Sequence, residues 1–117
     1  MEVVIYAEKS EYSELTGVIA ALPECCYRNV EITGCSDYDG FVEKLRAGPP
    51  QLILIAMNGA EGMEGVIAAK SLAENVPIIW LSDDKGFGAQ SYRLGCAYFH
   101  EKPVPSEALS TAIAKCV

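Results

Sequence analysis

Two apolar stretches, Gln51-Leu-Ile-Leu-Ile-Ala-Met57 and Val76-Pro-Ile-Ile-Trp-Leu81, decide the fold of this chain. Neither stretch alternates apolar and polar residues, as a strand with one solvated face does. Both are therefore predicted to be strands in the middle of a parallel sheet, where helices pack against both faces of a strand. The sequence between them has a helical pattern from about Gly62 to Ala73.

The sequence on either side of these strands continues the alternation of strands and helices. The further elements predicted are strands at residues 2–7, 29–35 and 97–99, and helices that begin near Ser10, Ser36–Asp37, Phe87 and Ser106. Ser10 is expected to cap the first helix and Pro23 to end it, and the strand at 29–35 has the pattern of an edge strand. Roughly five strand–helix units in so short a chain predict an open three-layer α/β sandwich, not a barrel.

The length and charge of the chain limit its function. Its 117 residues and 12.6 kDa accommodate one domain, residues 1–117, around one hydrophobic core. A net charge of −7 and a pI near 4.6 provide few cations for phosphate contacts, so this domain is not expected to bind nucleic acid directly. The longest apolar run, Leu52 to Met57, is far shorter than the roughly 20 residues that span a bilayer, so no membrane association is expected.

Cysteine and histidine usage argues against disulfides and metal sites. The five cysteines are odd in number and lack CxxC spacing, which favours core thiols in a reducing cytoplasm. They are Cys25, Cys26, Cys35, Cys96 and Cys116. His100 is the only histidine, so neither a zinc site nor a catalytic triad is expected. The glycines do not complete a dinucleotide-binding loop, so no nucleotide cofactor is expected.

Chemistry in an open α/β sheet takes place at the carboxyl ends of the strands, beside the point where the strand order reverses. The residues that follow the predicted strands therefore decide the function of this chain. They are Ala7-Glu8-Lys9, Ala56-Met57-Asn58-Gly59, Ser82-Asp83-Asp84 and Lys102-Pro103.

At these points the chain resembles a bacterial response-regulator receiver domain over nearly its whole length. Pro50-Gln-Leu-Ile-Leu-Ile-Ala56 with Gly62-Met-Glu-Gly65 is similar to the family's phospho-acceptor strand and loop, and Pro77–Ser82 is similar to its switch strand. Gly95-Cys-Ala-Tyr-Phe-His-Glu-Lys-Pro-Val104 is similar to its closing strand and Lys-Pro turn. The resemblance implies a flavodoxin-like, CheY-like (βα)5 fold with a five-stranded parallel sheet of order 2-1-3-4-5.

The carboxylates that such a domain uses are largely missing here. A receiver accepts a phosphoryl group on one aspartate, beside Mg²⁺ held by a carboxylate cluster. The resemblance places Ala56 at the acceptor position, or Met57 if the longer loop that follows shifts the alignment, and neither can be phosphorylated. Ala7 and Glu8 stand at the positions of the acidic pair, which leaves too few oxygen ligands for an ion that prefers octahedral coordination. Mg²⁺ binding is expected to be lost or very weak, and the chain resembles a pseudo-receiver.

Three positions around the missing acceptor keep residues of the family type. The resemblance implies switch positions at Ser82 and Phe99 and a phosphoryl-contacting lysine at Lys102. For Phe99, plain packing beside a helix is the simpler interpretation.

Lys102 needs a partner if no phosphoryl group is present. An unpaired ammonium is costly to bury, so Lys102 is expected to pair with Glu8, Asp83 or Asp84. Asp83 and Asp84 either supply a fixed negative charge or cap the following helix, and capping is favoured.

The first hypothesis for function is a non-catalytic regulatory module that binds a protein partner or a second copy of itself. The candidate interface carries Tyr92, Arg93 and Phe99, because aromatic and arginine residues are frequent at interface centres. The lead-in Ser91–Gly95 and the Lys-Pro turn are most similar to receivers of LytTR-type regulators, which implies a DNA-binding output domain beyond Val117.

The second hypothesis is a flavodoxin-like domain that binds a small molecule or an anion, or an enzyme of unknown reaction. Its site would be a crevice formed by Lys102, Ser82 and Asn58. The first hypothesis is favoured, because few polar groups converge on the predicted loops.

Overall fold

The computed structural model of the chain describes residues 1–22 and 29–116. Five parallel strands form the centre of the molecule. Their order is β2-β1-β3-β4-β5, so the predicted order 2-1-3-4-5 and the edge position of the second strand are confirmed. The strands are β1 Glu2–Tyr6, β2 Glu31–Cys35, β3 Leu52–Ile55, β4 Ile78–Ser82 and β5 Tyr98–Glu101.

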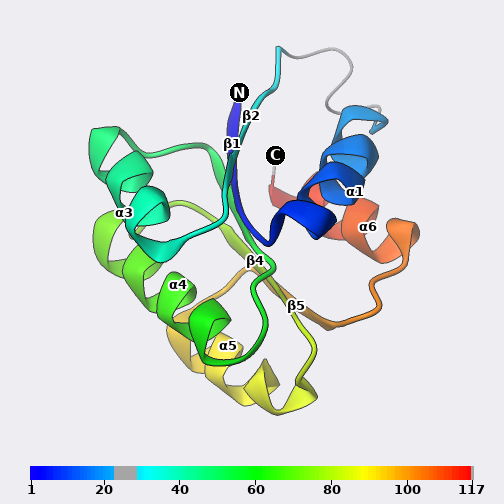
Figure 1. Cartoon of the computed structure of the whole chain (residues 1–117). Coiled ribbons are helices and arrows are strands. Elements are labelled where there is room, and N and C mark those ends of the chain that lie inside the picture. Colours follow the sequence, from blue (N-terminus) through cyan, green and yellow to red (C-terminus); the bar gives the residue numbers. More distant parts are fainter. Residues whose placement is uncertain (23–28, 117) are drawn as a thin grey trace.

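Five α-helices of the described residues cover the two faces of this sheet (Figure 1). α1 and α6 lie on one face and α3, α4 and α5 lie on the other, which gives the three predicted layers. The helices are α1 Lys9–Ala20, α3 Tyr38–Ala47, α4 Gly59–Leu72, α5 Gly88–Leu94 and α6 Ser106–Cys116, with a short 3-10 helix, η1 Lys85–Phe87, before α5. Within the described residues, no helix has both the length and the apolar character needed to cross a membrane.

The central strand β3 shows why its sequence does not alternate. All of its residues are fully buried: Leu52 and Leu54 pack on the α1/α6 face, whereas Ile53 and Ile55 pack on the α3/α4/α5 face. Burial of each such side chain stabilises the fold by about 1.5 to 3 kcal/mol relative to exposure. Two apolar layers therefore share one strand, as its sequence predicts.

The starts of the helices are predicted less well. The carbonyl oxygen of Glu8 already accepts the first helical hydrogen bonds, so Ser10 lies inside the first turn of α1 and the predicted cap at Ser10 is wrong. α4 begins at Gly59, earlier than predicted, and Gly59 has a φ of 62° that glycine adopts without strain. The cap at Asp37 is confirmed, because its Oδ1 accepts a hydrogen bond from Gly40 N at 2.6 Å.

The described cysteines lie nearer the surface than the sequence predicts. Cys35, Cys96 and Cys116 are free, and each is half-buried at the margin of the core. Burial raises the pKa of all three thiols, that of Cys96 to about 11, so the reactive thiolate is disfavoured at each position. Pro23, Cys25 and Cys26 lie outside the described residues.

Candidate functional site

The neighbouring strands β1 and β3 end side by side, at the end of the sheet where all five parallel strands have their carboxyl termini. Ala56 N donates a hydrogen bond to the carbonyl oxygen of Tyr6 at 2.8 Å, and Ala7 N donates to the carbonyl oxygen of Cys35 at 3.0 Å. Ala7 and Ala56 are both buried, and both pack on the α1/α6 face. Two methyl groups therefore stand at adjacent strand ends, where a parallel α/β sheet usually carries its polar site.

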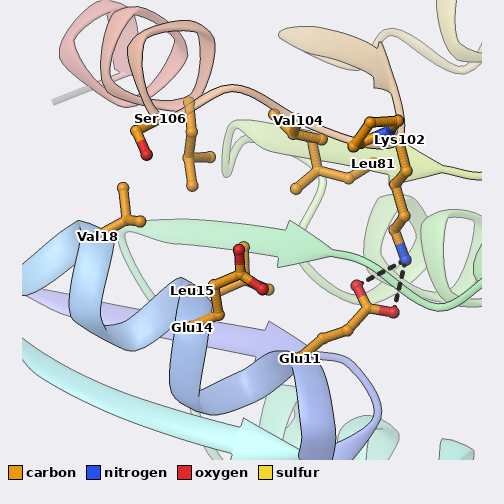
Figure 2. Close-up of a pocket in the computed structure, with 10 residues that line it drawn as sticks. Glu11, Glu14, Leu15, Val18, Leu81, Lys102, Val104 and Ser106 are labelled. Atoms are coloured by element: carbon orange, nitrogen blue, oxygen red, sulfur yellow. Dashed lines mark hydrogen bonds and ion pairs between the residues drawn. The ribbon is translucent and has the colours of Figure 1, made fainter.

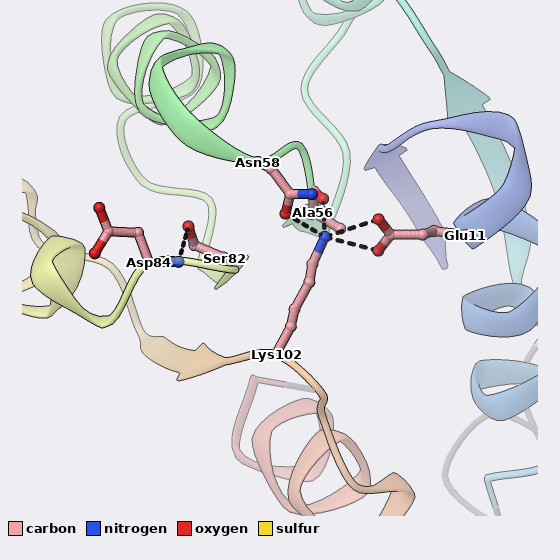
Figure 3. Close-up of polar contacts among 6 residues, drawn as sticks. All are labelled: Glu11, Ala56, Asn58, Ser82, Asp84 and Lys102. Atoms are coloured by element: carbon pink, nitrogen blue, oxygen red, sulfur yellow. Dashed lines mark hydrogen bonds and ion pairs between the residues drawn. The ribbon is translucent and has the colours of Figure 1, made fainter.

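Lys102 reaches across this end of the sheet from the turn that follows β5 (Figure 3). Its Nζ donates to the carbonyl oxygen of Ala56 at 2.6 Å, to Asn58 Oδ1 at 2.7 Å and to the carboxylate of Glu11, whose oxygens lie at 2.7 and 2.9 Å. An ammonium has three N–H donors, so these three acceptor groups use all of them. The side chain of Lys102 is 17% exposed and that of Glu11 is 30% exposed, so water screens the pair only in part.

A carboxylate pairs with Lys102, but the partners predicted from the sequence are wrong. Glu8, Asp83 and Asp84 are exposed, and within the described residues no ion pair joins them to Lys102. The partner is Glu11, in the first turn of α1, which points toward the ammonium in Figure 3. The position of Glu11 could have indicated this pairing, because an acid in the first helical turn after β1 lies close to the carboxyl ends of the strands.

Lys102, Glu11, Ala56 and Asn58 form one cluster of polar contacts, the Lys102 cluster. The Ser82 side chain does not join it. Its Oγ accepts a hydrogen bond from Asp84 N at 3.2 Å, and Asp84 Oδ1 accepts from Gly86 N at 2.8 Å. Asp84 therefore caps η1, in agreement with the favoured capping interpretation. Ser82 and Lys102 meet through their backbones, where Lys102 N donates to the Ser82 carbonyl oxygen at 2.7 Å. Of the crevice predicted from three residues, Lys102 and Asn58 come together and the buried Ser82 hydroxyl lies apart.

Phe99 belongs to an aromatic cluster beside α5. Its ring meets Trp80 edge-on at 5.5 Å, and Trp80 stacks on Phe87 at 5.2 Å, which favours the packing interpretation of Phe99. Trp80 was not singled out from the sequence, although its Nε1 is buried with no hydrogen-bond partner among the described residues. An apolar strand pattern gives no signal for an unpaired indole donor.

The predicted interface residues are accessible in part. Tyr92 and Arg93 lie on α5 and are exposed, Tyr92 to 88%, whereas Phe99 is half-buried.

Tyr6, the last residue of β1, has a buried ring that stacks on Phe41 with centroids 4.7 Å apart. Burial, with a smaller contribution from nearby carboxylates, raises the pKa of Tyr6 to about 12.

No family model and no curated protein matches the sequence. Solved structures do match: the response regulatory domain of MrkE from Klebsiella pneumoniae is 17% identical with a TM-score of 0.80, over 99% of this chain and 94% of that one. A response regulator from Thermotoga maritima, solved in complex with Mg²⁺-BeF, is 16% identical with a TM-score of 0.73, over 99% and 98% of the two chains. The fold is that of a CheY-like receiver domain. The pilus assembly protein CpaE from Caulobacter crescentus shares it, at 11% identity and a TM-score of 0.77 over 97% and 91% of the chains.

Mg²⁺ is the ion that this fold implies, and the residues at the strand ends do not fit it. The side chains of Ala7 and Ala56 offer no oxygen ligand, and the Lys102 ammonium already binds the Ala56 carbonyl oxygen. Among the described residues, no group of three or more His, Cys, Asp or Glu side chains is placed to hold a metal ion. Octahedral oxygen coordination therefore has too few donors here.

Proposed function

We propose that this chain is the receiver domain of a two-component-type response regulator that lacks a phospho-acceptor and signals through contact with a protein partner. Its structural neighbours include receiver domains of response regulators, which are in general non-enzymatic signalling domains. The observation that carries the proposal is the contact of Lys102 with Ala56. A backbone carbonyl oxygen, not a side-chain carboxylate, receives the lysine at the end of β3.

The position of the missing acceptor is better assigned to Ala56 than to Met57. Ala56 directly follows β3, contacts Lys102 and lies beside Ala7 on the α1/α6 face. Met57 packs on the opposite face, in the cluster that contains Val66 and Trp80. An acid in place of Ala56 would therefore meet the lysine, whereas an acid in place of Met57 would face the apolar core.

The Lys102 cluster also supports a domain held in one state. A phosphoryl group would have to displace Glu11 or Asn58 before Lys102 had a free donor. A signal must then come from a partner that binds one conformation better than another, because a ligand with equal affinity for both shifts nothing.

The face formed by α5, β5 and α6 is the proposed contact surface. It presents Tyr92 and Arg93 to solvent, for a second copy of the chain or another protein. The proposed output is transcriptional, from a LytTR-type or other DNA-binding domain linked beyond Val117, and the proposed site of action is the cytoplasm.

The alternative, a small-molecule or anion site or an enzyme at the Lys102 crevice, has weaker support. The donors of Lys102 are used by Glu11, Ala56 and Asn58, and the Ser82 hydroxyl lies apart from them. An incoming anion would find no free donor on the lysine.

Incubation with acetyl phosphate and Mg²⁺, followed by intact-mass measurement, tests the proposal. The mass should stay unchanged, because acyl-phosphate formation needs a carboxylate and a metal together. A receiver domain with an intact acceptor aspartate is the positive control. A stoichiometric phosphorylation that is labile to alkali and hydroxylamine would contradict the proposal, and Glu8→Gln and Asp83→Asn variants would then identify the acceptor.

A further inference from the structure

A groove separates α1 from the segment that leads into α6 (Figure 2). Its volume of about 430 Å³ lies within the range of about 300 to 1,000 Å³ that is typical of small-molecule sites. Glu11 and Lys102 lie at one end of the groove, and Ser106 lies on the α6 side. The groove is therefore on the α1/α6 face, away from the α5 surface that carries Tyr92.

The floor of the groove is apolar. Leu15 of α1, Leu81 of β4 and Leu109 of α6 are buried beneath it. Val18 and Val104 are half-buried in its walls, so part of their apolar surface still contacts water. A ligand that covers these two valines gains from the removal of that surface from water.

The charge of the groove is negative. The carboxylate of Glu11 is neutralised by Lys102 at 2.7 Å. Glu14, one turn further along α1, is exposed and has no ion pair within the described residues. Figure 2 shows its carboxylate directed into the space between α1 and the Val104–Ser106 segment. One uncompensated carboxylate thus faces an apolar floor.

We propose that this groove binds a small organic cation with an apolar body, such as an arylalkyl ammonium. The ammonium lies against Glu14, with the hydroxyl of Ser106 as a second acceptor, and the apolar body covers Val18 and Val104. An anion is disfavoured, because Glu14 repels it and the donors of Lys102 are already used. The site does not depend on the proposed signalling function, since Glu14 and Val18 take no part in the Lys102 cluster.

Three probes of matched shape test the charge preference: 2-phenylethylammonium, 2-phenylethanol and 3-phenylpropanoate. They are titrated into the isotope-labelled full chain, and the methyl shifts of Leu15, Val18 and Leu109 report binding. The ammonium should bind with a Kd on the order of a millimolar, and about threefold to fivefold more tightly than the alcohol, because a partly exposed ion pair contributes a preference of that size. The propanoate should bind most weakly.

Two variants and one control variant separate the charge from the shape of the groove. Glu14→Gln should remove the advantage of the ammonium over the alcohol. Glu43→Gln, on α3 at the opposite face of the sheet, is the matched control and should leave that advantage unchanged. Val18→Phe fills the groove and should weaken all three probes, with the emission of the buried Trp80 showing that the fold is kept.

Equal affinities for the three probes, an ammonium preference that survives in Glu14→Gln, or methyl shifts that map outside the groove would each overturn the proposal. A basic amphipathic peptide that shifts the same methyl groups, while the ammonium shifts none, would also overturn it, because the groove would then be a peptide surface.

Discussion

Lys102 Nζ and the carbonyl oxygen of Ala56 lie 2.6 Å apart, although the two residues are separated by 46 positions in the sequence. The same ammonium binds Glu11 in the first turn of α1. One side chain therefore joins the end of β3, the start of α1 and the turn after β5. In this chain Lys102 is a structural connection between three elements.

Removal of that connection should be measurable. Lys102→Met should lower the free energy of unfolding by about 1 to 2 kcal/mol, because the Ala56 carbonyl oxygen loses a charged donor and Glu11 loses its counterion. A double-mutant cycle with Glu11→Gln, measured by urea unfolding, should give a coupling of about 1 kcal/mol. Lys44→Met breaks a more exposed ion pair with Glu2 and should cost less. A Lys102→Met protein as stable as the parent would contradict this structural role.

Paired aspartates should create a Mg²⁺ site at the strand ends. Ala7 and Ala56 lie at adjacent strand ends on one face, so Ala7→Asp combined with Ala56→Asp places two carboxylates together. The double variant should be less stable than the parent, because it buries two acids, and Mg²⁺ should raise its Tm by a few degrees. Melts in MgCl₂ and in KCl of equal ionic strength measure the effect, with the parent chain as control. A Mg²⁺-dependent Tm in the parent would contradict the expected loss of metal binding.

The sequence predicted the sheet better than it predicted the site. The residues of β3 are apolar without alternation, and burial on both faces of a parallel sheet accounts for that pattern. The partner of Lys102 depended instead on where α1 begins. A shift of one residue in the start of a helix rotates every following side chain by about 100° relative to the sheet. Glu11 lies 91 positions from Lys102, so no local pattern linked the two residues.

Two helical glycines should respond oppositely to alanine. A Cβ at Gly17 in α1 would meet no atom within 4 Å, so Gly17→Ala should stabilise the protein by about 0.5 to 1 kcal/mol through helix propensity. A Cβ at Gly62 in α4 would overlap the carbonyl oxygen of Met57, so Gly62→Ala should destabilise it by about 1 to 3 kcal/mol. Chemical unfolding of both variants checks the pair. Equal effects would mean that α4 does not pack as closely on the β3–α4 loop as described.

The buried Tyr6 should make stability fall at alkaline pH. The unfolded chain loses the Tyr6 proton near pH 10.0, whereas the folded protein, with its raised pKa, keeps the proton until about pH 12. Between these values the unfolded state binds fewer protons, so unfolding becomes more favourable as pH rises. Tyr6→Phe should reduce this decline. The free energy of unfolding, measured at intervals of about one pH unit between about pH 9 and pH 12, checks this. Tyr92→Phe, at an exposed position, is the control and should keep the parental slope.

Self-association through the α5–β5–α6 face should occur without phosphorylation. Tyr92 is the most exposed large hydrophobic residue described and stands next to the exposed Arg93. Sedimentation velocity should show a concentration-dependent dimer, and Tyr92→Ala should weaken it by about tenfold, as loss of an aromatic interface anchor does. Tyr38→Ala, on α3, is the matched control and should sediment like the parent. Acetyl phosphate should change neither profile. A chain that stays monomeric at high micromolar concentration would exclude the homodimer and leave a different protein as the partner for this face.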